Sequence, residues 1–129
     1  MRRDREEHTM INVKDQVFNA IQGITENVSD QFPTEESKLP AILYTEEDNS
    51  VYEWCDDKES KAKLRYRVDI WDEVTTSILA MQVDAALSAL GLKRTMCMDV
   101  PDPAQVKHKV MRYEGIIDVE TERVYNNNL

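Results

Sequence analysis

The sequence predicts an α+β domain in which two amphipathic helices cover one face of a mainly antiparallel β-sheet, in the order α-β-β-β-α-β-β. Three observations predict this class: apolar residues at helical spacing near the N-terminus, a two-residue alternation over 63–70, and a second helical stripe that ends at Gly91. With 129 residues, 41% of them hydrophobic, the chain is expected to fold around one core. We assign residues 10–125 to this domain, 1–9 to a flexible charged extension and 126–129 to a frayed tail.

The first helix is expected between Asn12 and Val28, with Asn12 as its N-cap. Its apolar residues recur at helical spacing: Val13, Val17, Phe18, Ile21, Ile24 and Val28. The polar segment 29–39, which contains Pro33, is expected to be a surface loop that leads into the sheet.

Three strands are expected next, and the first two enclose an acidic segment. The short β-rich runs 41–46 and 51–55 flank Glu47-Asp48-Asn49-Ser50, which predicts a hairpin with an acidic tip. After the charged stretch 56–61, apolar and polar residues alternate as expected of a half-buried strand. The apolar set is Leu64, Tyr66, Val68 and Ile70, and the polar set is Lys63, Arg65, Arg67 and Asp69.

A second helix should follow, with Asp72 as a cap and Gly91 just past its C-terminus. Its apolar stripe is Ile78, Leu79, Val83, Ala86, Leu87 and Leu90. A strand over 92–100 is expected to end at Pro101-Asp102-Pro103, because proline removes a backbone donor. A last strand is expected over 108–119, in which Gly115 marks a bulge or a close contact with a helix.

Charge and cysteine content narrow the function classes. The chain carries 16 basic and 25 acidic residues, for a net charge of −9, which argues against a general nucleic-acid binder and a membrane-surface role. It has no apolar run of the roughly 20 residues that a membrane-spanning helix needs, and no signal peptide is expected. Cys55 and Cys97 lack the spacing of a zinc site or a disulfide framework, so a reducing cytoplasm is expected.

No constellation of residues predicts an enzyme, a cofactor or a metal site. The imidazoles are those of His8 and His108, and Cys97 lies between methionines, where a thiol is expected to pack as a small hydrophobe. The acidic runs 46–48 and 56–57 lack the ligand alternation and the glycine of a calcium loop. We therefore expect no catalytic, cofactor-binding or metal-binding residues.

The candidate functional residues are those of a protein interface. Aromatic rings near strand ends are typical of interfaces, although burial in the core explains them equally well. The stripe Lys63, Arg65 and Arg67 could meet the acidic hairpin of a neighbouring copy, or it could be a solvated sheet face. The candidate interface residues are Glu47, Asp48, Trp54, Asp56, Asp57, Arg65, Arg67, Lys109 and Arg112.

Five segments together resemble a known family. They are Met10-Ile11-Asn12-Val13, Leu39-Pro40-Ala41-Ile42-Leu43-Tyr44, Arg65-Tyr66-Arg67-Val68-Asp69-Ile70-Trp71, Leu90-Gly91-Leu92-Lys93-Arg94, and His108-Lys109-Val110-Met111-Arg112-Tyr113-Glu114-Gly115-Ile116-Ile117-Asp118. In this order they resemble the tail completion, or tail terminator, proteins of long-tailed bacteriophages and prophages, also described as tail-to-head joining proteins. The correspondence covers roughly residues 10–125, and the charged extension 1–9 departs from it.

The resemblance implies a structural protein that caps the completed tail tube as a hexameric ring and forms the joining surface to the head. Its partners would be other copies of itself, the tail tube protein, and a head connector or head-completion protein. Each copy could remain monomeric before assembly, and DNA would pass through without specific binding. Because a ring around DNA should not bind phosphate, the net charge of −9 further predicts that some acidic residues line its channel. The implied location is the host cytoplasm during assembly and then the neck of the virion. Two alternatives remain: a head-connector adaptor, and, from another class, a regulatory domain that binds a small ligand.

Overall fold

The computed structural model describes residues 10–33 and 38–126, which form an α+β fold with two helices and a six-stranded, mostly antiparallel sheet. The predicted extension 1–9 therefore lies outside the described residues, and so does most of the predicted tail. The elements in chain order are α1 (Lys14–Ile21), β1 (Asn27–Ser29), β2 (Ala41–Cys55), β3 (Lys58–Asp72), α2 (Ser77–Leu90), β4 (Lys93–Asp99), β5 (Lys107–Asp118) and β6 (Val124–Tyr125).

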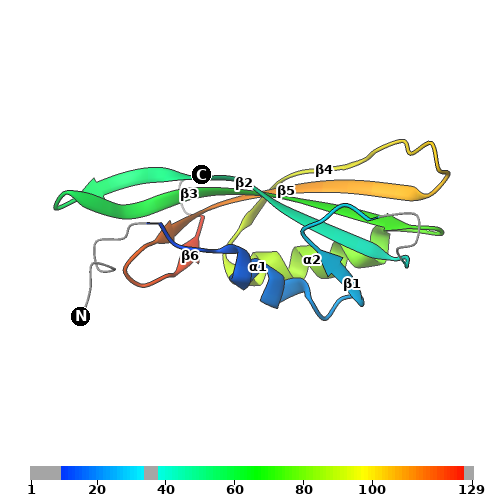
Figure 1. Cartoon of the computed structure of the whole chain (residues 1–129), viewed down its shortest axis with the longest axis horizontal. Helices are drawn as coiled ribbons and strands as arrows, with labels where there is room; N and C mark the ends of the chain where they lie inside the picture. Colours follow the sequence, from blue (N-terminus) through cyan, green and yellow to red (C-terminus); the bar gives the residue numbers. More distant parts are fainter. Residues whose placement is uncertain (1–9, 34–37, 127–129) are drawn as a thin grey trace.

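The strands are arranged in the order β1-β2-β3-β5-β4, and β6 also pairs with β5. β1 runs parallel to β2, whereas the other pairs are antiparallel. Because β3 occupies one side of β5, both β4 and β6 lie along its other side. Figure 1 shows the two helices on one face of this sheet, and the opposite face without a helix.

The core lies between the helices and one face of the sheet. The alternation predicted for β3 is confirmed, since its even-numbered apolar residues from Ala62 to Ile70 are fully buried. They pack with Val83 and Leu87 of α2 and with Val17 and Ile21 of α1. A two-residue period on the strands and a helical period on α1 and α2 thus supply the two surfaces of one core.

The predicted hairpin at residues 47–50 is wrong, because β2 is one continuous strand through this segment. The chain turns instead at Asp56 and Asp57, whose φ angles are 54° and 63°. Two central residues with positive φ form the tight turn that matches the twist of a two-residue hairpin, and aspartate tolerates this conformation better than most residues. Glu47 and Asp48 therefore lie in the middle of a strand, and the stretch 56–61 contains the turn.

The first helix is shorter than predicted and is followed by a strand that the sequence pattern did not indicate. α1 ends at Ile21, and Val28 lies in β1, paired with Ile42. The N-cap is Val13, one position later than predicted, and the side chain of Asn12 accepts a hydrogen bond from the backbone N–H of Lys14 (3.1 Å), the first residue of the helix. The apolar residues keep helical spacing as far as Val28, although the helix ends at Ile21. The pattern misled because a short half-buried strand can also place an apolar residue at that position.

The second helix confirms its predicted end but corrects one residue of its stripe. Gly91 has φ 117° and donates its N–H to the carbonyl oxygens of Leu87 and Ser88, as a helix C-cap does. The helix begins at Ser77, later than a cap at Asp72 implies, and Ile78 in its first turn is 65% exposed. Ile78 lies on the outer face of α2, because the sheet covers the face that carries Val83 and Leu87.

Gly115 confirms a close contact, but with a different partner. A Cβ atom at this position would lie 2.8 Å from Cδ2 of Leu92 and 3.3 Å from the carbonyl oxygen of Tyr125. The pairing of β3 with β5 continues through Gly115 without a register shift, so the residue marks no bulge. The absence of a side chain allows β6 and the start of β4 to approach β5.

Candidate functional site

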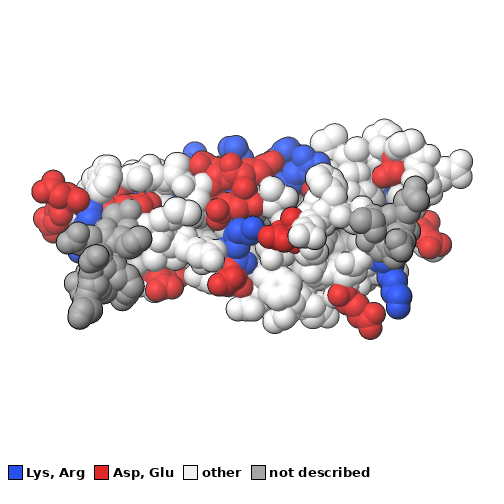
Figure 2. All heavy atoms as spheres, in the orientation of Figure 1, with Lys and Arg blue, Asp and Glu red and all other residues white. Residues whose placement is uncertain are grey.

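The outer end of the β2–β3 hairpin extends beyond both helices (Figure 1). We call residues 51–61 the arm. Three large apolar side chains of the arm are exposed, with relative exposures of 46% for Val51, 51% for Tyr52 and 60% for Trp54. Figure 2 shows acidic side chains at the end of the molecule where Figure 1 places the hairpin turn, which Asp56 and Asp57 form. The arm thus combines an acidic end with exposed aromatic rings, which are the side chains enriched at protein interfaces.

The middle of the helix-free face carries a network of charged side chains. Glu47 accepts hydrogen bonds from Nε of Arg112 (2.9 Å) and Nε of Arg65 (3.3 Å). The register places Asp48 opposite Arg65, and Arg65 opposite Glu114. The basic stripe predicted on this face is therefore present, but acidic residues of the same chain neutralise much of it.

A second part of this network surrounds Asp69, whose side chain is only 2% exposed. Its carboxylate accepts two hydrogen bonds from the Arg67 guanidinium (2.9 and 3.0 Å) and lies 2.8 Å from Nε2 of His108. The His108 ring stacks on Trp71 with centroids 4.4 Å apart, and the Phe32 ring packs edge-on against Trp71, with centroids 6.4 Å apart. Such a buried, bidentate arrangement fixes side-chain geometry, since each donor has a partner.

The pairing shifts the pKa values of Glu47 and Arg67. Hydrogen bonds from Arg112 lower the pKa of Glu47, with the charges of Arg112 and Arg65 adding to the effect. The hydrogen bonds to Asp69 raise the pKa of Arg67 further above neutrality. At neutral pH Glu47 and Arg67 are therefore charged and paired within one chain. Part of the predicted basic stripe thus has carboxylate partners in its own chain, and a contact with a neighbouring copy stays a prediction.

Two tyrosines on the helix side are also held by carboxylates. Tyr66 donates its hydroxyl to Glu46, and Tyr113 donates to Asp84 of α2 (2.7 Å). Burial is the main cause that raises the pKa of both hydroxyls. These pairs attach β2 to β3 and α2 to β5 by partly buried polar contacts at the margin of the core, so their role is structural.

The nine predicted interface residues fall into three places. Trp54, Asp56 and Asp57 lie on the arm, and Lys109 forms an ion pair with Asp99 of β4 (2.8 Å). The remaining five gather around the middle of the sheet: Glu47, Asp48, Arg65, Arg67 and Arg112. Sequence reasoning missed the cluster of Asp69, His108, Trp71 and Phe32. The sequence did hold a signal for this cluster, because Asp69 and Trp71 continue an outward series whose residues from Lys61 to Arg67 are basic.

The side chains at these three places are suited to noncovalent contacts with another protein. No group of three or more His, Cys, Asp or Glu side chains in the described part of the chain could hold a metal ion. Cys55 and Cys97 are both exposed free thiols. The expectation that Cys97 packs as a buried hydrophobe is wrong, because β4 is an edge strand whose residues are largely exposed.

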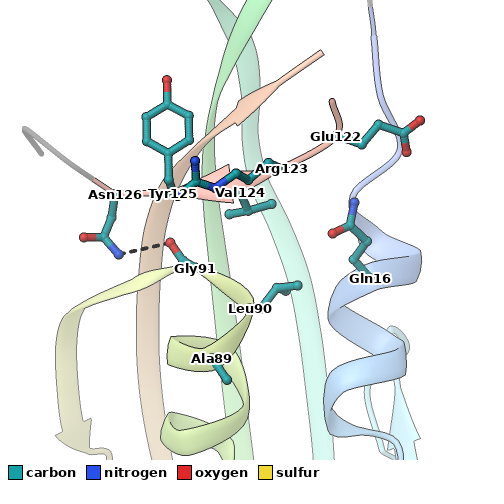
Figure 3. Close-up of a pocket in the computed structure, with 9 residues that line it drawn as sticks. All are labelled: Gln16, Ala89, Leu90, Gly91, Glu122, Arg123, Val124, Tyr125 and Asn126. Atoms are coloured by element: carbon teal, nitrogen blue, oxygen red, sulfur yellow. Dashed lines mark hydrogen bonds between the residues drawn. The ribbon is translucent and has the colours of Figure 1, made fainter. Parts of the chain in front are cut away.

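Two hollows on the surface carry polar or charged side chains in their walls. Figure 3 shows one of about 520 Å³ between α1, the end of α2 and β6, where Nδ2 of Asn126 donates to the carbonyl oxygen of Gly91 (3.0 Å). Gln16, Glu122 and Arg123 contribute polar atoms to its wall. A hollow of about 900 Å³ under the arm is lined mainly by charged residues. Both hollows are open to solvent and have charged side chains in their walls, whereas small-ligand sites are typically enclosed and mainly apolar.

Comparison with models of protein families finds none that matches this chain, and comparison with curated proteins finds no match. In the described parts of the chain, neither helix is long and apolar enough to cross a membrane. Arguments about function therefore depend on the chain's own residues.

Proposed function

We propose that this chain is a structural protein of a long-tailed phage or prophage, which caps the tail tube as a ring of six copies and forms the joining surface to the head. The observation that carries this proposal is the arm, where Val51, Tyr52 and Trp54 are exposed beyond the helices. The resemblance of residues 10–125 to tail terminator proteins supports the same function.

The arm is suited to bind another protein of the particle. No helix covers the end of this hairpin (Figure 1), so its two strands gain little stability from the rest of the chain. Exposed tyrosine and tryptophan rings contribute strongly when a partner buries them. The acidic residues at the turn would repel DNA phosphates and favour a protein with a basic surface.

An enzymatic role has no support from the geometry of the described residues. His108 is bound by Asp69 and stacked on Trp71, a setting that holds the ring in place. The exposed thiols lie on strand positions with no imidazole among their hydrogen-bond partners in the described structure. The proposal is therefore that the chain acts by assembly.

The test replaces Trp54 by alanine in the phage or prophage that encodes the chain, with Met81→Ala on the outer face of α2 as the control. Met81 is 73% exposed, so both substitutions remove a large apolar side chain from the surface. We expect Trp54→Ala to leave the purified protein folded while lysates contain filled heads and unjoined tails, and Met81→Ala to give joined particles. Electron micrographs of the lysates distinguish these outcomes.

Joined particles from a chain that lacks Trp54 would refute the role given to the arm. Joined particles after deletion of the whole gene would refute the function itself. Binding of the purified chain to the tail tube protein and to the head connector, compared directly, separates a tail cap from a connector adaptor.

A further inference from the structure

The sheet has two open edges, one on each side. β1 pairs with β2 only at Ala41, Ile42 and Leu43, so the remaining length of β2 has no strand beside it among the described residues. We call residues 44–55 the β2 edge. On the other side, β4 pairs with β5 and with no other described strand. Open edges present rows of unpaired backbone N–H and C=O groups, which readily pair with another chain.

The directions of the strands make these two edges compatible. The pairs β2–β3, β3–β5 and β5–β4 are all antiparallel, so direction alternates across the sheet and β4 runs opposite to β2. Copies related by rotation about an axis along the strands keep these directions. A β4 strand placed beside the β2 edge of the next copy would therefore be antiparallel to it, and the alternation would continue without a break.

The hydrogen bonds of β4 show which of its backbone N–H and C=O groups point away from β5. Val100 donates its N–H to the carbonyl oxygen of His108 (2.9 Å), so these opposed residues form a hydrogen-bonded pair. Such pairs alternate with non-bonded pairs along an antiparallel ladder. With the continuous register of 97–99 against 109–111, Met98 bonds toward β5, and the backbone groups of Cys97 and Asp99 point to the open edge.

The composition of the two edges leaves their backbone groups accessible. The charges along both edges have partners within the chain, since Glu47 binds Arg112, Arg94 binds Asp84 and Asp99 binds Lys109, so backbone pairing and not charge carries the contact. The centre of β4, residues 95–98, is uncharged, and neither edge contains proline or glycine. Most residues of β4 are exposed, and Met98 is 52% exposed. A seven-residue exposed strand without a charge at its centre lacks the usual protection against pairing.

The shape of β2 also suits a closed arrangement. Its register against β3 shifts between Glu46 and Asp48 and again twice between Val51 and Trp54. Bulges of this kind increase twist and curvature, and sheets that close on themselves use them. Closure removes open edges altogether.

We propose that β4 of one copy pairs antiparallel with the β2 edge of the next copy, so that the sheets of the ring form one continuous antiparallel sheet. This inference rests on the proposed function, because it requires a ring of copies. The contact is heterologous, with different surfaces on its two sides, as a ring requires.

The first test uses proline to remove one outward N–H from the edge. Cys97→Pro removes a donor that faces away from β5, whereas Cys97→Ala changes the same side chain and keeps the donor. Native mass spectrometry at raised concentration should show a species of six 15.0 kDa chains, about 90 kDa, for the unmodified chain and for Cys97→Ala. We expect Cys97→Pro to lose at least nine-tenths of this species while keeping its circular dichroism spectrum. If the unmodified chain is monomeric in solution, the three chains are compared by their incorporation into isolated phage tails.

The second test does not depend on the fold tolerating proline. In a Cys55→Ser background, single cysteines are placed along the β2 edge at Thr45, Ser50 and Tyr52, and a short bis-maleimide links thiols within reach. At least one of them should form a ladder of linked chains with Cys97, up to six chains. The ladder should vanish when Cys97 is replaced by serine. Ala85→Cys on the outer face of α2 should give no ladder.

The outcomes separate this inference from the function on which it rests. Six-chain rings that survive Cys97→Pro and give no ladder at any position would overturn the edge pairing and leave the ring intact. A chain that forms no six-chain species in solution and is absent from phage tails would overturn both. A ladder that appears only when tail tube protein is added, and that joins the two proteins, would assign the edge to that partner and also overturn the pairing between copies.

Discussion

Replacing Gly91 by alanine should destabilise the protein strongly, whereas the same change at Gly23 should not. Gly91 has φ 117°, and a Cβ atom there would lie 2.1 Å from the carbonyl oxygen of Val124. The left-handed backbone alone costs an L-residue roughly 1–2 kcal/mol. Relieving the overlap requires β6 to move, which exposes part of the buried Val124 side chain at a cost of about 1–2 kcal/mol. We therefore expect a loss of about 3 kcal/mol in the free energy of unfolding.

Urea denaturation followed by circular dichroism measures this loss directly. Nothing lies within 4 Å of a Cβ atom built at Gly23, where alanine should stabilise the protein slightly, by about 0.5 kcal/mol, because it reduces the freedom of the unfolded chain. The two variants share the same chemical change and should differ in sign. Equal effects at the two positions, or a loss below about 1 kcal/mol at Gly91, would refute the contact with β6 as the cause.

The charged network makes two further predictions. Asp69→Asn should lower the free energy of unfolding by about 2–3 kcal/mol, because it leaves the Arg67 guanidinium and His108 without a buried carboxylate, and a loss under about 0.5 kcal/mol would contradict this. Glu47→Gln should destabilise the protein most above pH 5, because Arg112 holds the pKa of Glu47 below its ordinary value of 4.5 and the stabilisation disappears as the pH falls through the lowered pKa. The free energies of unfolding of the unmodified chain and of Glu47→Gln, measured by urea titration from pH 7 to pH 3, should therefore converge as the pH falls. Values that diverge on acidification would show that the pairing has the opposite effect.

Much of the fold follows from patterns of neighbouring residues. The alternation from Lys63 to Ile70 predicts both the existence of β3 and the face that it buries. Gly91 predicts the end of α2 because few other residues accept its backbone conformation. The hairpin was misplaced because Asn49 and Ser50 favour turns locally, while pairing with Leu64 and Lys63 keeps them extended.

The candidate interface was predicted only in part. Trp54 and the aspartates of the turn lie together on an exposed arm, which sequence could suggest but not establish. Glu47 and Arg112 are 65 positions apart, and no local pattern indicates that they form an ion pair. The exposure of Cys97 was missed for a related reason, since a strand at the edge of a sheet and a strand at its centre can share one composition.

The local period of the side chains and the backbone preference of single residues are properties of the sequence, and they determined the helices, the main strands and the buried face of β3. The order of strands in the sheet depends on contacts between distant segments. That order alone decided that Asp69 meets His108, that part of the basic stripe is neutralised within the chain, and that β2 and β4 are left as open edges. Burial and pairing depend on which element lies alongside another, and only the assembled sheet determines this.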